Sequence, residues 1–315
     1  MESLRIVFMG TPDFAVGILD ALVQHQCQVV GVITAADKPA GRGQKVKYSA
    51  VKEYALSHQL PLLQPSNLKD ENFLAELAAL NANLQIVVAF RMLPKVVWDM
   101  PQHGTFNLHA SLLPDYRGAA PINWAIINGE TETGVTSFFI DDKIDTGAML
   151  LHAKTTIGPN ETAGELHDRL MKLGAQTVLD TVQLIAEGNP NTQIQAESTD
   201  LKTAHKLNKD NCKIDWNQTA QTIHNLIRGL SPYPAAWCYL FNHNQESTLK
   251  IYASQIERTE HELAVGTLIA DKKTLKVAVL DGFVHLVNVQ LPGKNKMKVA
   301  DLLNGFTFDV TARLY

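Results

Sequence analysis

The sequence predicts an α/β domain built on an open, mostly parallel, doubly wound sheet, followed by a small C-terminal β-barrel. Across residues 1–188, short apolar runs alternate with amphipathic helical segments, which is typical of a parallel sheet covered by helices on both faces. Beyond residue 207 the apolar runs are short, closely spaced and separated by turns, as in small barrels. The stretch between the two regions is polar and poor in large apolar residues, which indicates a linker.

These changes in composition and in the spacing of apolar runs divide the chain into two domains. We place the first domain at residues 1–188, the linker at residues 189–207 and the barrel domain at residues 208–315. A chain of 315 residues is long enough for two hydrophobic cores, because single cores stop growing before this size.

The first strand is expected at residues 4–9 and ends at Gly10. Thr11, Pro12 and Asp13 predict a helix start, with a capping side chain, a proline at the first helical position and an acid in the first turn. A dinucleotide site needs G-x-G-x-x-G, of which only Gly10 is present, so we interpret this segment as a tight turn. Further strands are expected at residues 28–33, 84–89, 104–110, 134–140 and 149–157, and helices through residue 23 and at 50–57, 121–127 and 161–187. In the barrel domain we expect a helix at 218–228 and strands at 237–241, 249–253, 266–269, 275–279 and 284–289.

Composition indicates a soluble globular protein of the cytoplasm, with 45% hydrophobic and 19% charged residues. The N-terminus lacks a basic start followed by an apolar run, and no apolar segment approaches the roughly 20 residues that span a bilayer. Cys27, Cys212 and Cys238 are widely spaced and odd in number, so they suit neither a disulfide framework nor a pair of metal ligands. Because no segment is long and apolar enough to span a bilayer, we expect no membrane partner.

The strand at residues 104–110 carries polar side chains where a buried strand should be apolar. Asn107 and His109 lie two residues apart, so they point to the same face near the carboxyl end of the strand, where α/β sheets bind ligands. A core histidine beside a hydrogen-bonded asparagine is the alternative. Asp145 follows in the segment I-D-T-G after the next strand, where an ordinary turn is the alternative.

Together, Asn107, His109 and Asp145 suit acyl transfer to an amine. An amide and an imidazolium can donate hydrogen bonds to a tetrahedral oxyanion, and an adjacent carboxylate stabilises the imidazolium. The same carboxylate can take the proton of the amine. Ser111 does not lie in a G-x-S-x-G elbow, which argues against a serine hydrolase, and no Cys/His cluster has the spacing of zinc ligands.

The segment FNLHASLLPDYRGAAPINW, at residues 106–124, together with IDTG at residues 144–147, closely resembles the 10-formyltetrahydrofolate-dependent formyltransferases. The resemblance implies a Rossmann-like formyltransferase domain, an OB-like barrel, and transfer of a formyl group from 10-formyltetrahydrofolate, as co-substrate and without metal, to a primary amine. It implies that Asn107, His109 and Asp145 are catalytic. It also implies folate contacts from the turn that follows the strand, formed by Ser111, Leu112, Leu113 and Pro114.

Two further stretches decide which amine is expected. The basic segment DKPAGRGQKVK, at residues 37–47, resembles the P-A-G-R-G loop of methionyl-tRNA formyltransferases, in which an Arg matching Arg42 engages the acceptor end. A solvated surface loop is the alternative. The segment from LPGK to DLLN, at residues 291–304, resembles the end of the same enzymes, whereas glycinamide-ribotide formyltransferases resemble only the first two-thirds of the chain. The expected tRNA-binding residues are Arg42, Lys38, Lys45 and Lys47, with Lys206, Lys209 and Lys213 from the linker side of the barrel.

The resemblance therefore implies transfer of a formyl group to the free amino group of methionyl initiator tRNA, giving N-formylmethionyl-tRNA for translation initiation. We expect a monomer whose partners are this tRNA and folate, with no DNA. A sugar-nucleotide N-formyltransferase, which would not need the basic loop, is the alternative within the same chemistry. A folate- or RNA-binding protein without catalysis is the alternative from another class, and the presence of all three catalytic residue types argues against it. One departure from the family is Ala89-Phe90-Arg91, where its members usually have A-Y-G.

Overall fold

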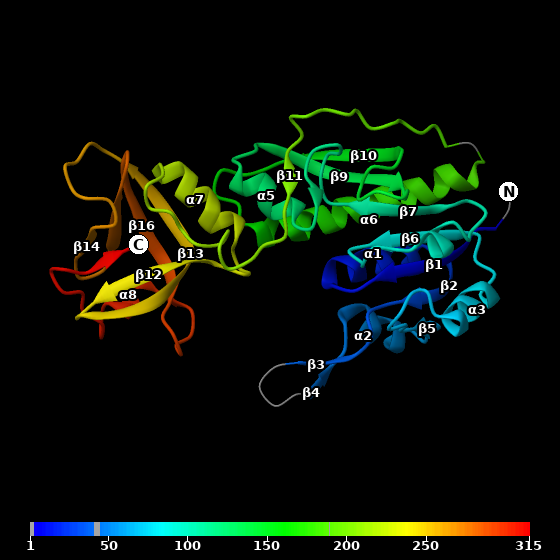
Figure 1. Ribbon diagram of the computed structural model, residues 1–315, viewed down its shortest axis with the longest axis horizontal. Coiled ribbons are helices and arrows are strands. Elements are labelled where there is room, and N and C mark those ends of the chain that lie inside the picture. The colour runs from blue at the N-terminus through cyan, green and yellow to red at the C-terminus, as the bar shows by residue number, and fades with distance from the viewer. Residues whose placement is uncertain (1–2, 41–44, 189) are drawn as a thin grey trace. The chain divides into compact units, whose positions relative to one another are not determined.

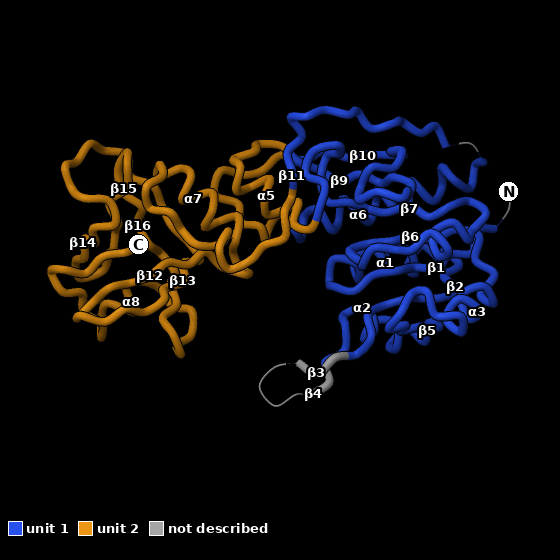
Figure 2. Tube along the Cα trace, in the orientation of Figure 1, with its two compact units in different colours: residues 1–118, 133–155, 167–203 blue, residues 119–132, 156–166, 204–315 orange. Residues whose placement is uncertain are grey.

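The computed structural model describes residues 3–40, 45–188 and 190–315, with the backbone alone at 38–40 and 45–46. The chain forms two compact units (Figure 2), which we treat separately. The first unit contains Met1–Gly118, Thr133–Thr155 and His167–Thr203, and the second contains Ala119–Glu132, Thr156–Leu166 and Ala204–Tyr315. Each unit therefore draws on several stretches of the chain.

The first unit is built on a seven-stranded sheet of order β10-β9-β7-β6-β1-β2-β5 (Figure 1). The strands are β1 (Arg5–Gly10), β2 (Gln28–Ile33), β5 (Leu62–Leu63), β6 (Leu84–Val88), β7 (Thr105–His109), β9 (Glu132–Phe139) and β10 (Met149–Thr156). β1 runs parallel to β2 and β6, β6 to β7, and β2 to β5, whereas β9 runs antiparallel to β7. The expectation of an open, mostly parallel sheet is confirmed.

Helices cover both faces of this sheet. They are α1 (Asp13–Gln24), α2 (Ala50–Ser57), α3 (Glu71–Ala79), α4 (Lys95–Trp98) and α6 (Ala163–Ala186). On one face, Phe73 of α3 and Val97 of α4 belong to the same apolar cluster as Met9 of β1. On the other face, a Cβ added to Gly174 of α6 would meet Leu108 of β7 and Ile18 of α1, so these helices pack closely on the sheet. The sheet is therefore doubly wound, as predicted.

The boundaries of several elements differ from the sequence-based expectation. The helix expected from Thr11 begins at Asp13, with Pro12 at the N-cap position and without a side-chain cap, so Thr11 is not the cap. α3 and α4 were not predicted, although Asp70 caps α3 by accepting a hydrogen bond of 3.0 Å from the backbone N–H of Phe73. Short elements also missed include β3 (Lys38–Ala40), β4 (Lys45–Lys47), β8 (Arg117–Gly118) and β11 (Thr203–Ala204).

The second unit is an antiparallel barrel. Its sheet follows the order β14-β15-β16-β13-β12-β18, with β17 paired to β16. An antiparallel bridge between Thr267, just before β14, and Arg313 of β18 joins the two ends of this sheet, which confirms the predicted barrel. Its elements are α7 (Ala220–Gly229), β12 (Ala236–Asn242), β13 (Gln245–Arg258), β14 (Leu268–Ala270), β15 (Leu275–Val279), β16 (Gly282–Gln290), β17 (Met297–Lys298), α8 (Val299–Leu302) and β18 (Arg313–Leu314). α5 (Pro121–Ile127) also belongs to this unit and contacts α7.

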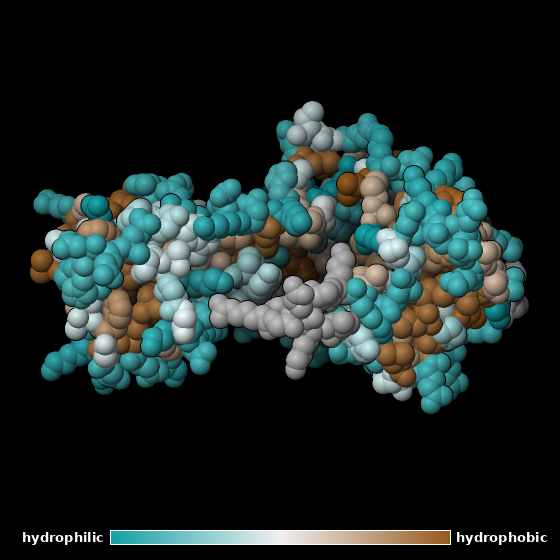
Figure 3. All heavy atoms as spheres, turned by 60° about the horizontal axis from the view of Figure 1, so that its bottom comes forward, coloured by the Kyte–Doolittle hydropathy of each residue, from teal (hydrophilic) through white to brown (hydrophobic). Residues whose placement is uncertain are grey.

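The apolar side chains of the barrel unit gather inside the sheet and under α7. Ile223 and Ile227 of α7 are almost completely buried in one cluster with Trp216 and strand residues such as Ile251. On the molecular face shown in Figure 3, hydrophilic side chains surround scattered apolar ones. No helix among the described residues is long and apolar enough to cross a membrane.

Candidate active site

β7 brings two polar side chains to one face at its carboxyl end. His109 is the last residue of the strand and is 7% exposed, and Asn107 is half-buried. Asn107 pairs with Val87 of β6 on one side and Phe138 of β9 on the other, so β7 is an inner strand. The half-buried amide of Asn107 makes no side-chain hydrogen bond to any other described residue, unlike the hydrogen-bonded core asparagine of the alternative interpretation. By strand alternation it lies on the same face of β7 as His109.

The ring of His109 is fixed by a backbone carbonyl. Its Nε2 lies 2.8 Å from the carbonyl oxygen of Tyr116. Because a carbonyl oxygen only accepts hydrogen bonds, Nε2 carries the proton in this contact. Nδ1 is then the ring nitrogen that gains a proton when the imidazole becomes charged, and Nδ1 lies 3.8 Å from Oδ2 of Asp145. This distance is too long for a hydrogen bond but short enough for attraction between the two charges.

Asp145 reaches the histidine from the loop between β9 and β10. Its side chain is 15% exposed, and Oδ2 accepts a hydrogen bond of 3.0 Å from the backbone N–H of Gly118. Its backbone has φ of 55°, in the left-handed region that non-glycine residues seldom adopt. Such a conformation persists where the surroundings fix it, and it often occurs at functional sites.

The turn after β7 is tied to β9 through one hydroxyl group. Thr136 donates from Oγ1 to the carbonyl oxygen of Ser111 at 2.7 Å and accepts from the backbone N–H of Leu113 at 3.2 Å. The hydroxyl of Ser111 donates to the carbonyl oxygen of Asp115 at 2.7 Å, so its proton is used within the turn. Ser111 and Leu113 are buried, whereas Leu112 and Pro114 are half-buried. The Leu113–Pro114 peptide bond is cis.

The structure thus brings together the three predicted catalytic residues and the predicted folate turn. It adds three groups that the sequence did not identify: the backbone N–H of Gly118, the hydroxyl of Thr136 and the side chain of Gln195. Thr136 is completely buried on a strand that also buries Thr133 and Ser137, and this run of polar residues was an available signal. No such signal pointed to Gln195, because it lies in a polar stretch and nothing in the sequence distinguishes a buried amide from the exposed polar residues around it.

The basic segment at residues 37–47 is only partly described. β3 and β4 pair as a two-stranded antiparallel sheet, in which Lys38 pairs with Lys47 and Ala40 with Lys45. Arg42 lies outside the described residues, and so do the side chains of Lys38 and Lys45. Lys47 is exposed.

The other predicted tRNA residues belong to the second unit, and two of them, Lys209 and Lys213, lie beside aromatic rings on β12. Lys209 Nζ lies 5.0 Å from the ring centroid of Trp237, and Lys213 Nζ lies 4.7 Å from that of Tyr239. The two rings meet edge to face at 5.2 Å. Lys206 and Lys209 are exposed and Lys213 is half-buried, so this strip presents cations next to aromatic faces.

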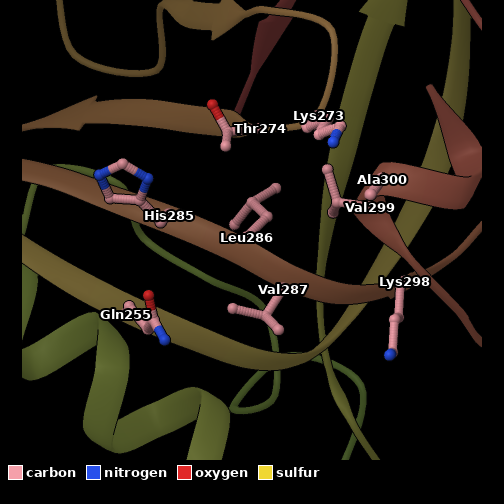
Figure 4. A pocket seen from close by; sticks show the side chains of 9 residues that line it. All are labelled: Gln255, Lys273, Thr274, His285, Leu286, Val287, Lys298, Val299 and Ala300. Atoms are coloured by element: carbon pink, nitrogen blue, oxygen red, sulfur yellow. The ribbon is translucent and has the colours of Figure 1, made fainter.

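An open pocket of about 250 Å³ lies in the barrel unit, and none of the predicted site residues line it (Figure 4). Its polar lining includes Lys273, Lys298 and His285, and the last is hydrogen-bonded to Glu257 at 2.5 Å. It is smaller than typical ligand pockets of about 300–1,000 Å³. Across the described part of the chain, no group of three or more His, Cys, Asp and Glu side chains is arranged to hold a metal ion.

Comparisons with known proteins agree with the sequence resemblance. The family model described as Formyl transferase matches residues 4–182, and that described as Formyl transferase, C-terminal domain matches residues 206–307. A methionyl-tRNA formyltransferase of Flavobacterium johnsoniae is 67% identical over 315 residues, covering 100% of both chains. One from Bacteroides fragilis (strain ATCC 25285) is 54% identical over 310 residues, covering 97% of this chain and 96% of its own.

A solved structure supports the same fold. WlaRD, a sugar 3N-formyl transferase crystallised in the presence of dTDP and 5-N-formyl-THF, superposes with a TM-score of 0.64 at 23% identity, over 94% of this chain and 100% of its own. At this identity the likeness concerns the fold alone. Full-length relatives above 50% identity and two matching family models confirm the resemblance, and the chain belongs to the methionyl-tRNA formyltransferase family.

Proposed function

We propose that this protein transfers the formyl group of 10-formyltetrahydrofolate to the free amino group of methionyl initiator tRNA, giving N-formylmethionyl-tRNA for translation initiation. The observation that carries the chemistry is the meeting of His109 and Asp145 at 3.8 Å, on the face of β7 that also carries Asn107. The names of the full-length relatives support the choice of the amine.

Each of the three side chains has its own role in acyl transfer. The amine nitrogen bonds to the formyl carbon, and the carbonyl oxygen becomes an oxyanion that the amide of Asn107 and the imidazolium of His109 stabilise. Asp145 takes the proton that the amine loses. The bond from the formyl carbon to the folate nitrogen then breaks, and that nitrogen takes up a proton, so the reaction neither gains nor loses protons. We propose that no metal takes part.

The tautomer of His109 decides which of its atoms binds the oxyanion. Nε2 donates to Tyr116, so Nδ1–H is the donor left for the reacting oxygen. Nδ1 also faces Asp145, whose negative charge stabilises the imidazolium. The carboxylate of Asp145 therefore both stabilises the imidazolium of His109 and accepts the proton of the amine.

For folate, we propose that the turn at residues 111–114 is the binding element. The half-buried side chains of Leu112 and Pro114 face the ligand, while buried Ser111 and Leu113 keep the turn in shape through their bonds to Thr136 and Asp115.

For tRNA, we propose two basic surfaces. The first is the segment with Arg42, Lys38, Lys45 and Lys47. The second contains Lys206 together with Lys209 and Lys213, which lie beside Trp237 and Tyr239, since cations next to aromatic rings suit both phosphates and unstacked bases.

We propose residues 1–188 as the catalytic domain, 189–207 as the linker and 208–315 as the tRNA-binding domain. The protein acts as a monomer in the cytoplasm, with initiator tRNA and folate as its partners.

Steady-state kinetics of catalytic variants test the chemistry. Asn107→Ala and His109→Ala should lower kcat by about 10²–10³, the usual effect of losing one oxyanion donor, while KM for the formyl donor changes little. Asp145→Asn should lower kcat at least as much, because it removes the base and the charge beside His109. A wild-type kcat in Asp145→Asn would refute the proposal.

A further inference from the structure

Part of the linker runs across the loops that form the candidate active site. Gln193 pairs with Met149, at the start of β10, through two backbone hydrogen bonds of 2.8 Å, since the N–H of each residue donates to the carbonyl oxygen of the other. Further along the linker, the carbonyl oxygen of Lys202 accepts a hydrogen bond of 2.6 Å from the backbone N–H of Tyr116, the residue whose carbonyl binds His109. We call residues 193–202 the strap. All of these residues belong to the first unit.

Within the strap, Gln195 uses its whole amide group to join the two loops. Its Nε2 donates to the carbonyl oxygens of Asp145, at 3.0 Å, and Gly147, at 2.8 Å. Its Oε1 accepts from Nε of Arg117 at 3.1 Å and from Nη2 at 2.6 Å. An amide has two N–H donors and an oxygen with two lone pairs, so no hydrogen-bonding capacity is left over. The side chain is only 5% exposed, whereas the residues on either side of it are exposed.

The partners of Gln195 fix the orientation of its amide. The guanidinium of Arg117 can only donate and the two carbonyl oxygens can only accept, so the oxygen and nitrogen of the amide cannot exchange places without losing all four bonds. A glutamate in this position could still bind Arg117, but it would turn an acceptor towards two carbonyl oxygens.

Gln195 thereby holds both ends of the contact that places the carboxylate. The backbone N–H of Gly118 binds Asp145 Oδ2, and Gln195 binds Arg117 on one side of this contact and the Asp145 backbone on the other. The left-handed backbone of Asp145, at φ 55°, needs such external support.

We propose that Gln195 is a positioning residue, which sets the rate of formyl transfer by holding Asp145 against His109. This assignment rests on the proposed role of Asp145 in the reaction. If Gln195 only stabilised the fold, its replacement would lower the stability of the first unit. The loss of rate would then be the same whether or not the Asp145 carboxylate is present.

The test is a double-mutant cycle in single-turnover assays with excess enzyme, which resolve low residual rates. Gln195→Leu removes all four hydrogen bonds, and Gln195→Glu keeps the partner of Arg117 but loses both donors to the carbonyl oxygens. Each should lower the rate of formyl transfer by about 10- to 100-fold, as expected for a displaced catalytic group, with KM for the formyl donor within about twofold. Introduced into Asp145→Asn, the same changes should have almost no further effect, because the group they position is already disabled.

Glu197→Leu is the matched control, since the Glu197 side chain is exposed and makes no hydrogen bond to another described residue. A near-wild-type rate in folded Gln195→Leu or Gln195→Glu would overturn the assignment. So would an equal loss in the wild-type and Asp145→Asn backgrounds, or failure of both Gln195 variants to fold. If Asp145→Asn itself kept the wild-type rate, the proposed function would fail instead, so the two failures are distinguishable.

Discussion

Thr136 connects the turn at residues 111–114, which we propose binds folate, to the sheet through a single hydroxyl group. Thr136→Val keeps the shape of the side chain but leaves the carbonyl oxygen of Ser111 and the backbone N–H of Leu113 without this partner. Loss of a partner by a buried polar group costs about 1–3 kcal/mol, so we expect a lower free energy of unfolding and a raised KM for the formyl donor. Thr133→Val, on the same strand, is the control, because the Thr133 side chain is buried and bonds no other described residue. Equal effects in the two variants, measured by urea unfolding and donor kinetics, would show that the hydroxyl of Thr136 has no special role.

The residues that we propose to act through their side-chain type left a signal in the sequence, whereas the groups that contribute by their position did not. Asn107 and His109 stood out because strand periodicity put two polar groups on one face at a strand end, and the motif identified Asp145. Gly118 acts through its backbone N–H, and the carbonyl of Tyr116 orients the histidine, so neither function depends on the identity of the side chain. Gln195 reaches the site only because the strap folds back along β10.

Among the elements, strands with continuous apolar runs were predicted closely, as for β2 at Gln28–Ile33 and β6 at Leu84–Val88. The direction of β9 could not be predicted, because its residues are buried on both faces, as in the parallel strands, although it runs antiparallel to β7. α3 was missed because it is short and only Phe73 and Leu77 are buried on it, which leaves a weak helical pattern.

α7 carries a buried histidine that should make stability depend on pH. Burial, and secondarily the charge of Arg228, lowers the pKa of His224, whose ring contacts Ser254 at 3.0 Å and Asn160 at 3.2 Å. The unfolded chain therefore binds a proton first as pH falls below about 6.5, so stability is fully present above that value and decreases below it. One such group contributes a slope of at most about 1.4 kcal/mol per pH unit.

His224→Gln should therefore reduce the difference in the free energy of unfolding between pH 7.5 and 5.5. His25→Gln, on the exposed end of α1, is the control. An unchanged difference in the free energy of unfolding in His224→Gln would show that this histidine is not the source of the pH dependence.

At the scale of the whole molecule, the sequence predicted a Rossmann-like sheet and a barrel, and both are present. The contributions of Ala119–Glu132 and Thr156–Leu166 to the second unit were not predicted, because contacts between segments far apart in sequence leave no local pattern. The proposed binding of tRNA by basic residues, and of folate by the turn at residues 111–114, predicts that the two substrates respond differently to salt. Phosphate contacts release counterions, so apparent affinity for charged tRNA should fall steeply as salt rises, while KM for the formyl donor hardly changes.

Variants of the basic residues should reduce this salt dependence. Replacing Lys209 and Lys213 by Ala should lower the slope of log affinity against log salt by about 0.7–0.9 for each phosphate that the protein no longer neutralises. Arg42→Ala should impair use of charged tRNA strongly and leave KM for the donor nearly intact. Lys172→Ala, exposed on α6, is the control. If tRNA and donor kinetics change equally in the Arg42 and Lys209/Lys213 variants, these residues do not bind tRNA.

The identity of the amine is the central claim, and a competition between amines tests it most directly. Purified enzyme is given 10-formyltetrahydrofolate with charged initiator tRNA, glycinamide ribotide or an amino-sugar nucleotide, and the formylated product is identified by mass spectrometry. We predict rapid formylation of methionyl initiator tRNA, loss of that product in Asp145→Asn, and negligible formylation of the two small amines. Efficient formylation of the amino-sugar nucleotide, with methionyl-tRNA left unmodified, would contradict the account.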